Sequence, residues 1–344
     1  MNLFYFIYCI NSHLRILLRS LKKNLYFKIS LRLWTKIYIF YLCKKEFHEY
    51  FLVFFNNPLS KMNFNANGLI WELKEPIVMG ILNVTPDSFY ENSRCTDNKS
   101  ILKRAEEIVL QGGKIIDIGG YSSRPGCDEV SEEEELHRVT NAANIIRTAF
   151  PEVPISIDTF RAKVAEKCVT ECGASIINDI SGGEIDNKMF ETVAKLGVPY
   201  ILMHMKGNPQ NMTTNTHYSD FMKEIFMYFA EKTEKLRLLG VKDIILDPGF
   251  GFSKTIDQNY ELLDNLEAFS IFKMPILVGF SRKRMIWQLL DSSPTESLNG
   301  TSVLNSVALM KGANIIRVHD VKEAVEVVKI HKELNNCSAK KLTI

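Results

Sequence analysis

From Pro76 onward, the chain alternates short apolar runs rich in β-branched residues with longer amphipathic stretches. Nearly continuous apolar runs of this length are typical of parallel strands that are buried on both faces. Eight strands, each followed by a helical stretch within about 260 residues, predict an α/β fold of the (β/α)8 TIM-barrel type instead of an open doubly wound sheet. The predicted strands are Ile77–Asn83, Lys114–Gly119, Pro154–Asp158, Ser175–Asp179, Pro199–His204, Asp243–Asp247, Pro275–Gly279 and Asn314–Val318.

The segments between these strands have the length and apolar spacing of amphipathic helices. A chain of 344 residues allows one large domain or two smaller ones, and its 46% hydrophobic and 24% charged residues suit a single large core. We therefore expect one barrel domain over residues 62–344. The predicted helices include Lys99–Gln111, Ser131–Ala149, Arg161–Glu171, Tyr218–Leu239 and Glu296–Lys311.

Residues 1–61 differ from this body in composition. They are rich in aromatic residues and carry ten Lys and Arg against only Glu46 and Glu49. Their apolar bursts are each broken before the roughly 20 residues that a membrane span needs. We expect an unstructured or locally helical extension. Three interpretations stay open: sequence translated upstream of a true start at Met62, a targeting or membrane-surface segment, or a folded domain.

The cysteines and the start of the chain bear on its location. Seven cysteines lack the paired short spacings of a zinc site or of a secreted disulfide framework. The first residues also lack the basic region, apolar stretch and cleavage site of a secretory signal. A reducing compartment suits such a chain, and the predicted location is the cytoplasm.

Polar side chains occur at or just after the carboxyl end of nearly every predicted strand. In a barrel these ends form one rim, where barrel enzymes carry their chemistry, so residues far apart in the sequence are expected to converge there. A single carboxylate after a strand is often only a helix cap, but capping is a weaker explanation when nearly every strand end carries a polar residue. The set is Asn83, Asp117, Asp158, Asn178, Asp179, His204, Asp247, Ser281, Lys283, Arg317 and His319.

Seven short motifs carry these rim residues. They are Asn83–Phe89 (NVTPDSF), Ser122–Gly126 (SSRPG), Ser156–Thr159 (SIDT), Asn178–Gly182 (NDISG), Asp247–Phe252 (DPGFGF), Ser281–Lys283 (SRK) and Arg317–Asp320 (RVHD). In order and spacing they resemble the dihydropteroate synthase family, over about residues 76–334. The resemblance implies a TIM-barrel enzyme of folate biosynthesis, a sulfonamide target, that condenses a dihydropterin diphosphate with 4-aminobenzoate. It also implies Mg²⁺ and a homodimer.

The pterin pocket is the part of the site that residue chemistry supports best. A pterin edge presents N–H donors beside carbonyl and imine acceptors, so it needs a carboxylate and amides on one side and a donor opposite. The resemblance assigns Asp158, Asn178, Asp247 and Lys283 to the pterin. Asp158, as an anion, can also stabilise positive charge developing on the pterin methylene.

The leaving diphosphate needs cations and hydrogen-bond donors. Arg317 offers a planar fork of donors, and His319 lies two residues further on, on the same side of an extended strand end. The resemblance implies that Arg317, His319 and Ser123 hold the diphosphate and that Asn83 is a Mg²⁺ ligand. A lone Asn is reasonable, because Mg²⁺ keeps several water and phosphate ligands.

The 4-aminobenzoate slot is implied by the resemblance alone. Two loops, residues 84–92 and 121–129, are expected to close over the substrates and exclude water. The implied slot residues are Phe89, Arg124, Pro125, Phe252 and Arg284, and the implied catalytic residues are Asp158, Lys283, Arg124 and Asp87. Arg284 stands where several members of the family carry Ser, so its contact with the aminobenzoate carboxylate is an open point.

Two alternatives share the predicted barrel. A methyltetrahydrofolate-dependent methyltransferase would share Asp158, Asn178 and Asp247, but it needs no diphosphate cradle such as Arg317 and His319. A non-catalytic pterin-binding barrel would be expected to lose loop residues, and none of the motif residues is missing. Nucleic acid is not an expected partner, because the body is mildly acidic and its basic residues are dispersed. A membrane is not expected either, because no apolar stretch is long enough to span one. The expected partners are the two small-molecule substrates.

Overall fold

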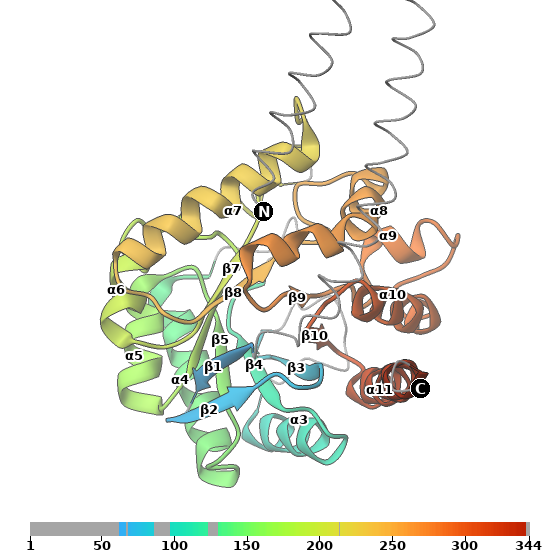
Figure 1. Cartoon of the computed structure of the whole chain (residues 1–344). Helices are drawn as coiled ribbons and strands as arrows, with labels where there is room; N and C mark the ends of the chain where they lie inside the picture. The colour runs from blue at the N-terminus through green and yellow to red at the C-terminus, as the bar shows by residue number, and fades with distance from the viewer. Residues whose placement is uncertain (1–61, 67, 86–96, 123–129, 213, 342–344) are drawn as a thin grey trace, which may run out of the picture. The chain divides into compact units, whose positions relative to one another are not determined.

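Eight parallel strands form the centre of the molecule in the computed structural model (Figure 1), which describes residues 62–66, 68–85, 97–122, 130–212 and 214–341. Hydrogen bonds join the strands in the order β8-β7-β6-β5-β4-β3-β10-β9. A parallel bridge between Leu246 and Ile276 links the two outermost strands and closes the barrel. The predicted fold class is confirmed. The strands are β3 (Ile77–Asn83), β4 (Ile115–Gly119), β5 (Ile155–Asp158), β6 (Ile176–Asp179), β7 (Tyr200–Met203), β8 (Ile244–Asp247), β9 (Leu277–Val278) and β10 (Ile315–Val318).

Helices surround the barrel, and local caps define several of their starts. Asp97 accepts hydrogen bonds from two backbone N–H groups at the start of α3, and Ser131 and Asp220 each accept one at the start of α4 and α7. The Asp220 cap explains why α7 begins at Phe221, three residues after the predicted start. The helices are α3 (Asn98–Leu110), α4 (Glu132–Ala149), α5 (Ala162–Cys172), α6 (Met189–Leu196), α7 (Phe221–Leu238), α8 (Ile256–Asp264), α9 (Arg284–Trp287), α10 (Leu298–Met310) and α11 (Val321–Lys341), with the 3₁₀ helix η2 (Leu266–Phe272).

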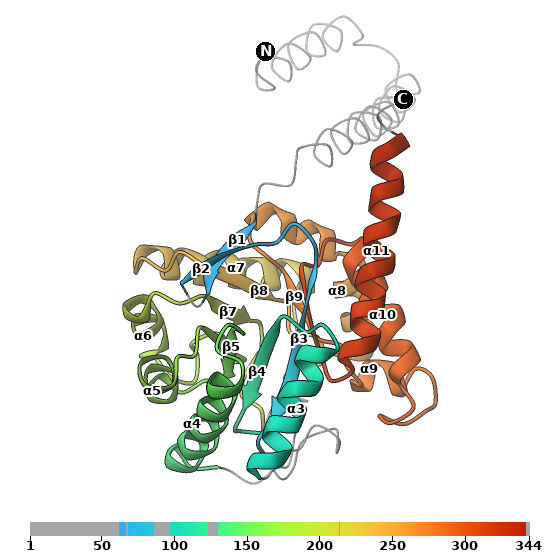
Figure 2. The same cartoon turned by 90° about the horizontal axis from the view of Figure 1, so that it is seen from below.

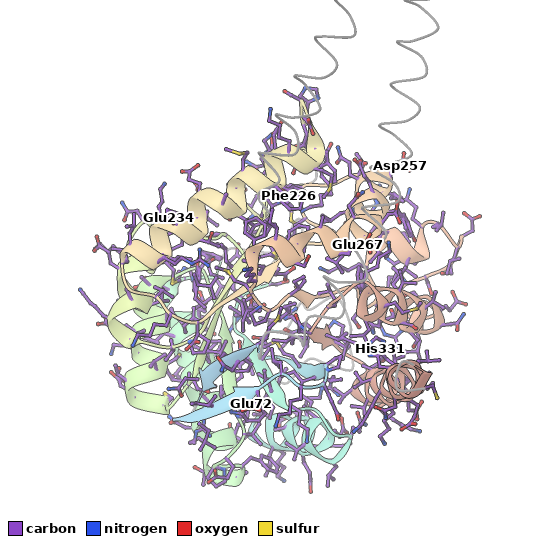
Figure 3. The ribbon with its side chains drawn as sticks, in the orientation of Figure 1. Glu72, Phe226, Glu234, Asp257, Glu267 and His331 are labelled. Carbon is purple, nitrogen blue, oxygen red and sulfur yellow. The ribbon has the colours of Figure 1, made fainter. Side chains whose placement is uncertain are left out.

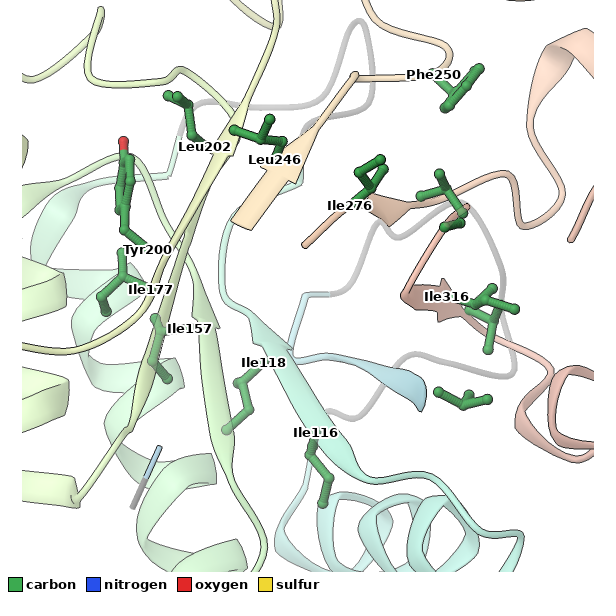
Figure 4. Packing of buried hydrophobic residues seen from close by; sticks show 14 of the residues in the cluster. Ile116, Ile118, Ile157, Ile177, Tyr200, Leu202, Leu246, Phe250, Ile276 and Ile316 are labelled. Atoms are coloured by element: carbon green, nitrogen blue, oxygen red, sulfur yellow. The ribbon is translucent and has the colours of Figure 1, made fainter. Parts of the chain in front are cut away.

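The core between strands and helices follows from the alternation of side chains along each strand. Every second residue points outward and packs against the helices, as Figure 4 shows for Ile116 and Ile118 on β4 and for Ile157 on β5. Charged side chains such as Glu234 on α7 and Glu267 in η2 lie on the outer surface of the helical layer (Figure 3). The intervening strand residues therefore point into the barrel.

A two-stranded hairpin covers one end of the barrel (Figure 2). Its strands are β1 (Asn63–Ala66) and β2 (Leu69–Glu72), and the buried Phe64 and Ala66 pack on the inward-pointing residues at the start of the barrel strands. These inward-pointing residues are Met79, Ile115, Ile176, Ile201, Ile245, Leu277 and Ile315. This hairpin was not predicted, although the Asn-Gly pair at 67–68 is a strong hairpin signal.

The hairpin leaves the opposite end of the barrel, at the carboxyl ends of the strands, for chemistry. Within the described part of the chain, every helix is too short or too polar to cross a membrane. Residues 1–61 lie outside the described residues, so the extension and the domain boundary at residue 62 stay predictions.

A chain that begins at Met62 should fold as stably as the full chain, because it retains the hairpin and all barrel strands. Thermal unfolding followed by circular dichroism would check this. A further deletion through Glu72 removes Phe64 from the barrel base and should lower the melting temperature clearly. A Met62 chain as unstable as this longer deletion would contradict the prediction.

Candidate active site

The inward-pointing residues at the carboxyl ends of the strands are polar. Ile116 and Ile118 pack against the helices, so Asp117 between them points into the barrel. The same alternation turns Asp158, Asn178, Asp247 and Arg317 inward. In the register of the sheet, Asp158 on β5 lies beside Asn178 on β6. The alternation thus gathers three carboxylates, an amide and a guanidinium at one barrel mouth.

Arg317 joins these groups. Its Nε donates to Asp117 Oδ2 at 2.6 Å, and its Nη2 donates to Asp158 Oδ2 at 2.7 Å. Asn178 Nδ2 also donates to Asp117 Oδ2, at 3.2 Å. Burial lowers the pKa of Arg317, but the two neighbouring carboxylates reverse this and hold the pKa above its ordinary value. Arg317 therefore stays a cation in contact with a residue assigned to the pterin.

The two carboxylates assigned to the pterin are both difficult to ionise. Burial raises the pKa of Asp158 to about 7, with Arg317 opposing the rise and Asp117 adding to it. Burial also raises the pKa of Asp247, against the cationic Lys283 and a 2.8 Å hydrogen bond from the Gly249 N–H. A pterin edge that donates N–H groups would favour the ionised forms of both carboxylates.

Lys283 lies between Asp247 and an aromatic wall. Its Nζ donates to the Phe250 carbonyl at 2.5 Å and lies 4.6 Å from the centre of the Phe252 ring. Burial lowers the pKa of Lys283 to about 8, and Asp247 opposes the shift. Gly251 (φ +81°) makes room for the lysine stem, because a Cβ there would lie 2.9 Å from Lys283 Cδ. The structure thus brings Phe252, assigned to the aminobenzoate slot, into contact with Lys283, assigned to the pterin.

The loop that carries Phe252 is held by a residue that the sequence analysis did not single out. Lys254 is buried, and its Nζ donates to the carbonyls of Gly249 at 2.9 Å and Phe252 at 3.0 Å. The same Nζ lies 3.1 Å from His204 Nδ1. Burial lowers the pKa of Lys254 to about 7. No pattern in the sequence distinguishes this lysine from a solvated one.

His319 lies among cations. Its carbonyl accepts a 2.6 Å hydrogen bond from Arg104, and its N–H donates to Ser281 Oγ at 3.1 Å. Burial holds the pKa of the ring well below its usual range, and Arg317, Arg104, Arg282 and Lys283 lower it further. A bound anion at this end of the mouth would offset the repulsion between these cations and a protonated His319 ring.

An apolar cluster lies beside the polar groups. The half-buried Tyr121 and Phe252 pack on the buried residues Phe160, Ile180, Met203, Met205 and Met212. Tyr121 and Phe160 meet edge to face with ring centroids 5.1 Å apart. Such a surface suits the faces of flat aromatic substrates.

The remaining predicted residues fall into three groups. Asn83 ends β3 at the mouth. Arg284 is exposed at the start of α9 and donates to Gln288 Oε1 at 2.6 Å, so the structure does not join it to Lys283 and Phe252. Asp87, Phe89, Ser123, Arg124 and Pro125 lie outside the described residues, and their roles stay predictions.

Two rim residues do not converge on the mouth as expected. Asp179 accepts hydrogen bonds from Tyr200 Oη at 2.7 Å and from the Gly183 N–H at 2.9 Å, in the layer between strands and helices. His204 packs edge to face on Tyr228, with ring centroids 4.8 Å apart. The prediction that they converge on the mouth was wrong. Asp179 and His204 each follow an inward-pointing residue, so the alternation along the strand turns them outward.

The comparisons with known proteins agree with this geometry. The family model described as pterin binding enzyme matches residues 79–319. Dihydropteroate synthase of Escherichia coli K12 is 44% identical over 271 residues, 78% of this chain and 95% of the relative. The Bacillus subtilis dihydropteroate synthase is 41% identical over 76% of this chain and 90% of its own length.

Solved structures give the same result. Yersinia pestis dihydropteroate synthase, crystallised with a sulfonamide drug, matches 80% of this chain and 100% of its own with a TM-score of 0.76 and 41% identity. The Thermus thermophilus dihydropteroate synthase in complex with 4-aminobenzoate matches 79% of this chain and 99% of its own with a TM-score of 0.71 and 32% identity. This chain therefore belongs to the dihydropteroate synthase family of pterin-binding enzymes.

Proposed function

We propose that this chain condenses 6-hydroxymethyl-7,8-dihydropterin diphosphate with 4-aminobenzoate to give 7,8-dihydropteroate and diphosphate. The observation that carries the proposal is one barrel mouth in which a carboxylate and amide set adjoins a group of cations. Asp158, Asn178 and Asp247 supply the acceptors and the amide for a pterin, and Arg317 touches Asp158 directly. The cations beside His319 suit the diphosphate of the same molecule.

The relatives support both substrates. One solved family member holds 4-aminobenzoate, and the Coxiella burnetii enzyme, 34% identical to this chain, is in complex with pteroic acid. The methyltransferase alternative loses support, because it accounts for neither the similarity to these enzymes nor the cations around His319. A homodimer is expected from the resemblance and a cytoplasmic location from the cysteines, and both stay predictions.

A magnesium ion suits the donors at the end of β3. Asn83 offers a side-chain carbonyl oxygen, and Gly119 leaves room for this side chain, because a Cβ there would lie 3.0 Å from Asn83 Oδ1. The described residues hold no group of three His, Cys, Asp or Glu side chains that could bind a metal by itself. We propose that Asn83 would hold Mg²⁺, whose remaining ligands would be water and phosphate oxygens, and that the ion would neutralise charge on the leaving diphosphate.

The reaction needs no protein nucleophile. The bond between the pterin methylene carbon and the diphosphate oxygen breaks, and its electron pair leaves with the diphosphate. The amine nitrogen of 4-aminobenzoate then bonds to the methylene carbon and releases a proton to water or to the departing diphosphate. Asp158 and Asp247 stabilise the positive charge that develops on the pterin, and Arg317 and His319 stabilise the departing diphosphate. Lys283 and Phe252 form the wall against which the second substrate is oriented.

A product assay tests this function. The purified chain is incubated with the dihydropterin diphosphate, 4-aminobenzoate and Mg²⁺, and dihydropteroate and diphosphate are quantified. We expect equimolar products, loss of turnover on chelation of Mg²⁺ and competition by a sulfonamide against 4-aminobenzoate. Diphosphate release without dihydropteroate, or no reaction, would exclude the proposed activity.

The pH dependence should report the two perturbed groups. We expect kcat/KM for the pterin diphosphate to fall below about pH 7, where Asp158 gains a proton, and above about pH 8, where Lys283 loses one. The substrate diphosphate also titrates, so the control is Asp158→Asn. In this variant, the part of the fall in kcat/KM at low pH that comes from protonation of Asp158 should be absent. An acid limb identical in Asp158→Asn would contradict the role of Asp158.

A further inference from the structure

Asp117 is the one carboxylate at the barrel mouth to which the sequence analysis assigned no role. It is fully buried on β4, and its Oδ2 accepts hydrogen bonds from Arg317 Nε at 2.6 Å and from Asn178 Nδ2 at 3.2 Å. Among the described residues, its Oδ1 has no hydrogen-bond partner. Burying a carboxylate away from water costs free energy, so its position in contact with two site residues points to a role in the site.

The bonds of Arg317 divide its guanidinium into two parts. Asp117 and Asp158 take Nε and Nη2, whereas Nη1 makes no hydrogen bond with the described residues. A guanidinium is planar, so a fixed Nε fixes the direction of the remaining donors as well. Those donors form the fork that binds a phosphate bidentately.

The two carboxylates that bind Arg317 differ in access. The Asp158 side chain is 20% exposed, whereas the Asp117 side chain is 0% exposed. A substrate can therefore reach Asp158, as its assignment to the pterin requires, but it cannot replace Asp117. We therefore expect Asp117 to keep its contact with Arg317 when the site is filled.

We infer that Asp117 is a positioning residue, which holds Arg317 through Nε so that the rest of the guanidinium faces the diphosphate. The inference rests on the proposed function, since it takes Arg317 as the diphosphate ligand. Asp117 also holds the Asn178 amide and so links the pterin and diphosphate parts of the site. It acts through Arg317 and Asn178 and does not touch the substrate.

The affinity for pyrophosphate distinguishes an orienting effect of Asp117 on Arg317 from a purely electrostatic effect of its charge. Removing a buried anion next to an anion site should tighten pyrophosphate binding if only charge matters. If orientation matters, Asp117→Asn should weaken binding about tenfold or more, as expected for a lost oriented bond to a charged group. Isothermal titration of the full chain with pyrophosphate and Mg²⁺ measures the difference. The matched control is Asp179→Asn, a buried carboxylate on the outer side of the barrel, which should bind like the unaltered chain.

The same substitution in an Arg317→Lys background excludes a merely structural role. A lysine ammonium has no plane to orient, so Asp117→Asn should cause no further weakening there, whereas a general distortion of the barrel would weaken binding in both backgrounds. Should Asp117→Asn fail to fold, the ¹⁵N–¹H signal of Arg317 Nε in the unaltered chain decides. We expect this proton to be protected from exchange both with and without pyrophosphate, and loss of protection on binding would overturn the inference.

The outcomes also separate this inference from the proposed function. No pyrophosphate binding by the unaltered chain would exclude the diphosphate site, and the inference with it. Equal or tighter binding by Asp117→Asn, with normal binding by the unaltered chain, would overturn only the role of Asp117.

Discussion

Asp247→Ala should weaken the binding of a bare pterin and of the pterin diphosphate by the same amount. Asp247 is buried at the mouth, close enough to Lys283 that each shifts the pKa of the other. Its loss removes the proposed acceptor for the pterin edge and leaves the half-buried Lys283 without this counter-charge. Losing a charged partner in such a pocket costs about 2–4 kcal/mol, roughly 30-fold to 1,000-fold in affinity. Isothermal titration with both ligands measures it.

The control for this variant is Asp257→Ala, an exposed carboxylate on α8 (Figure 3). It should bind both ligands like the unaltered chain. The assignment of Asp247 to the pterin ring would be wrong if Asp247→Ala weakened only the pterin diphosphate, since the defect would then lie with the diphosphate.

Arg317→Ala should lose pyrophosphate binding and also destabilise the fold. The substitution leaves the fully buried Asp117 and the partly buried Asp158 without their cation. Breaking a buried ion pair by removing one partner costs about 3–5 kcal/mol, so chemical denaturation should show a large decrease in the free energy of unfolding. Asp117→Asn should restore part of that stability in the Arg317→Ala background, because it removes the orphaned charge.

Arg317→Ala should also weaken the binding of bare pterin, because Arg317 contacts Asp158. An arginine remote from the pterin residues would have no such effect. Without the guanidinium, the pKa of Asp158 rises above its value of about 7, and Asp158 is protonated at neutral pH. The ratio of unaltered to variant affinity for bare pterin should therefore approach one as the pH rises, while the loss for pyrophosphate persists. The exposed Arg237→Ala serves as the control. Unaltered pyrophosphate affinity in Arg317→Ala would contradict the account.

The barrel could be predicted from the sequence because each strand carries its own signal. All eight predicted strands exist, and their carboxyl ends fall within two residues of the predicted ones. The hairpin at residues 63–72 is too short to show a clear alternation, and its burial depends on a barrel base built from seven other segments. The prediction that the polar residues at the strand ends converge was wrong for Asp179 and His204. The alternation of side chains along each strand turns both of them outward.

Four of the predicted site residues meet in the described part of the chain, but the connections between them were not predictable. Asp158, Asn178, Asp247 and Lys283 meet at the mouth because four separate strands end there. The ion pair between Arg317 and Asp117 joins positions 200 residues apart, and no local pattern specifies that Nε, not Nη1, makes the contact. The same holds for Lys254, whose burial depends on carbonyls of the loop after β8.

The central claim is that this mouth stabilises a cation at the pterin methylene while diphosphate leaves. The most direct measurement is the secondary kinetic isotope effect on kcat/KM for pterin diphosphate deuterated at that methylene. A carbon that changes from tetrahedral towards planar before the amine bonds to it loosens its C–H bending motions, so the account predicts a clearly normal effect, with slower reaction of the deuterated substrate. An isotope effect of unity, in a reaction shown to be limited by chemistry, would mean that the amine displaces the diphosphate directly and would contradict the account.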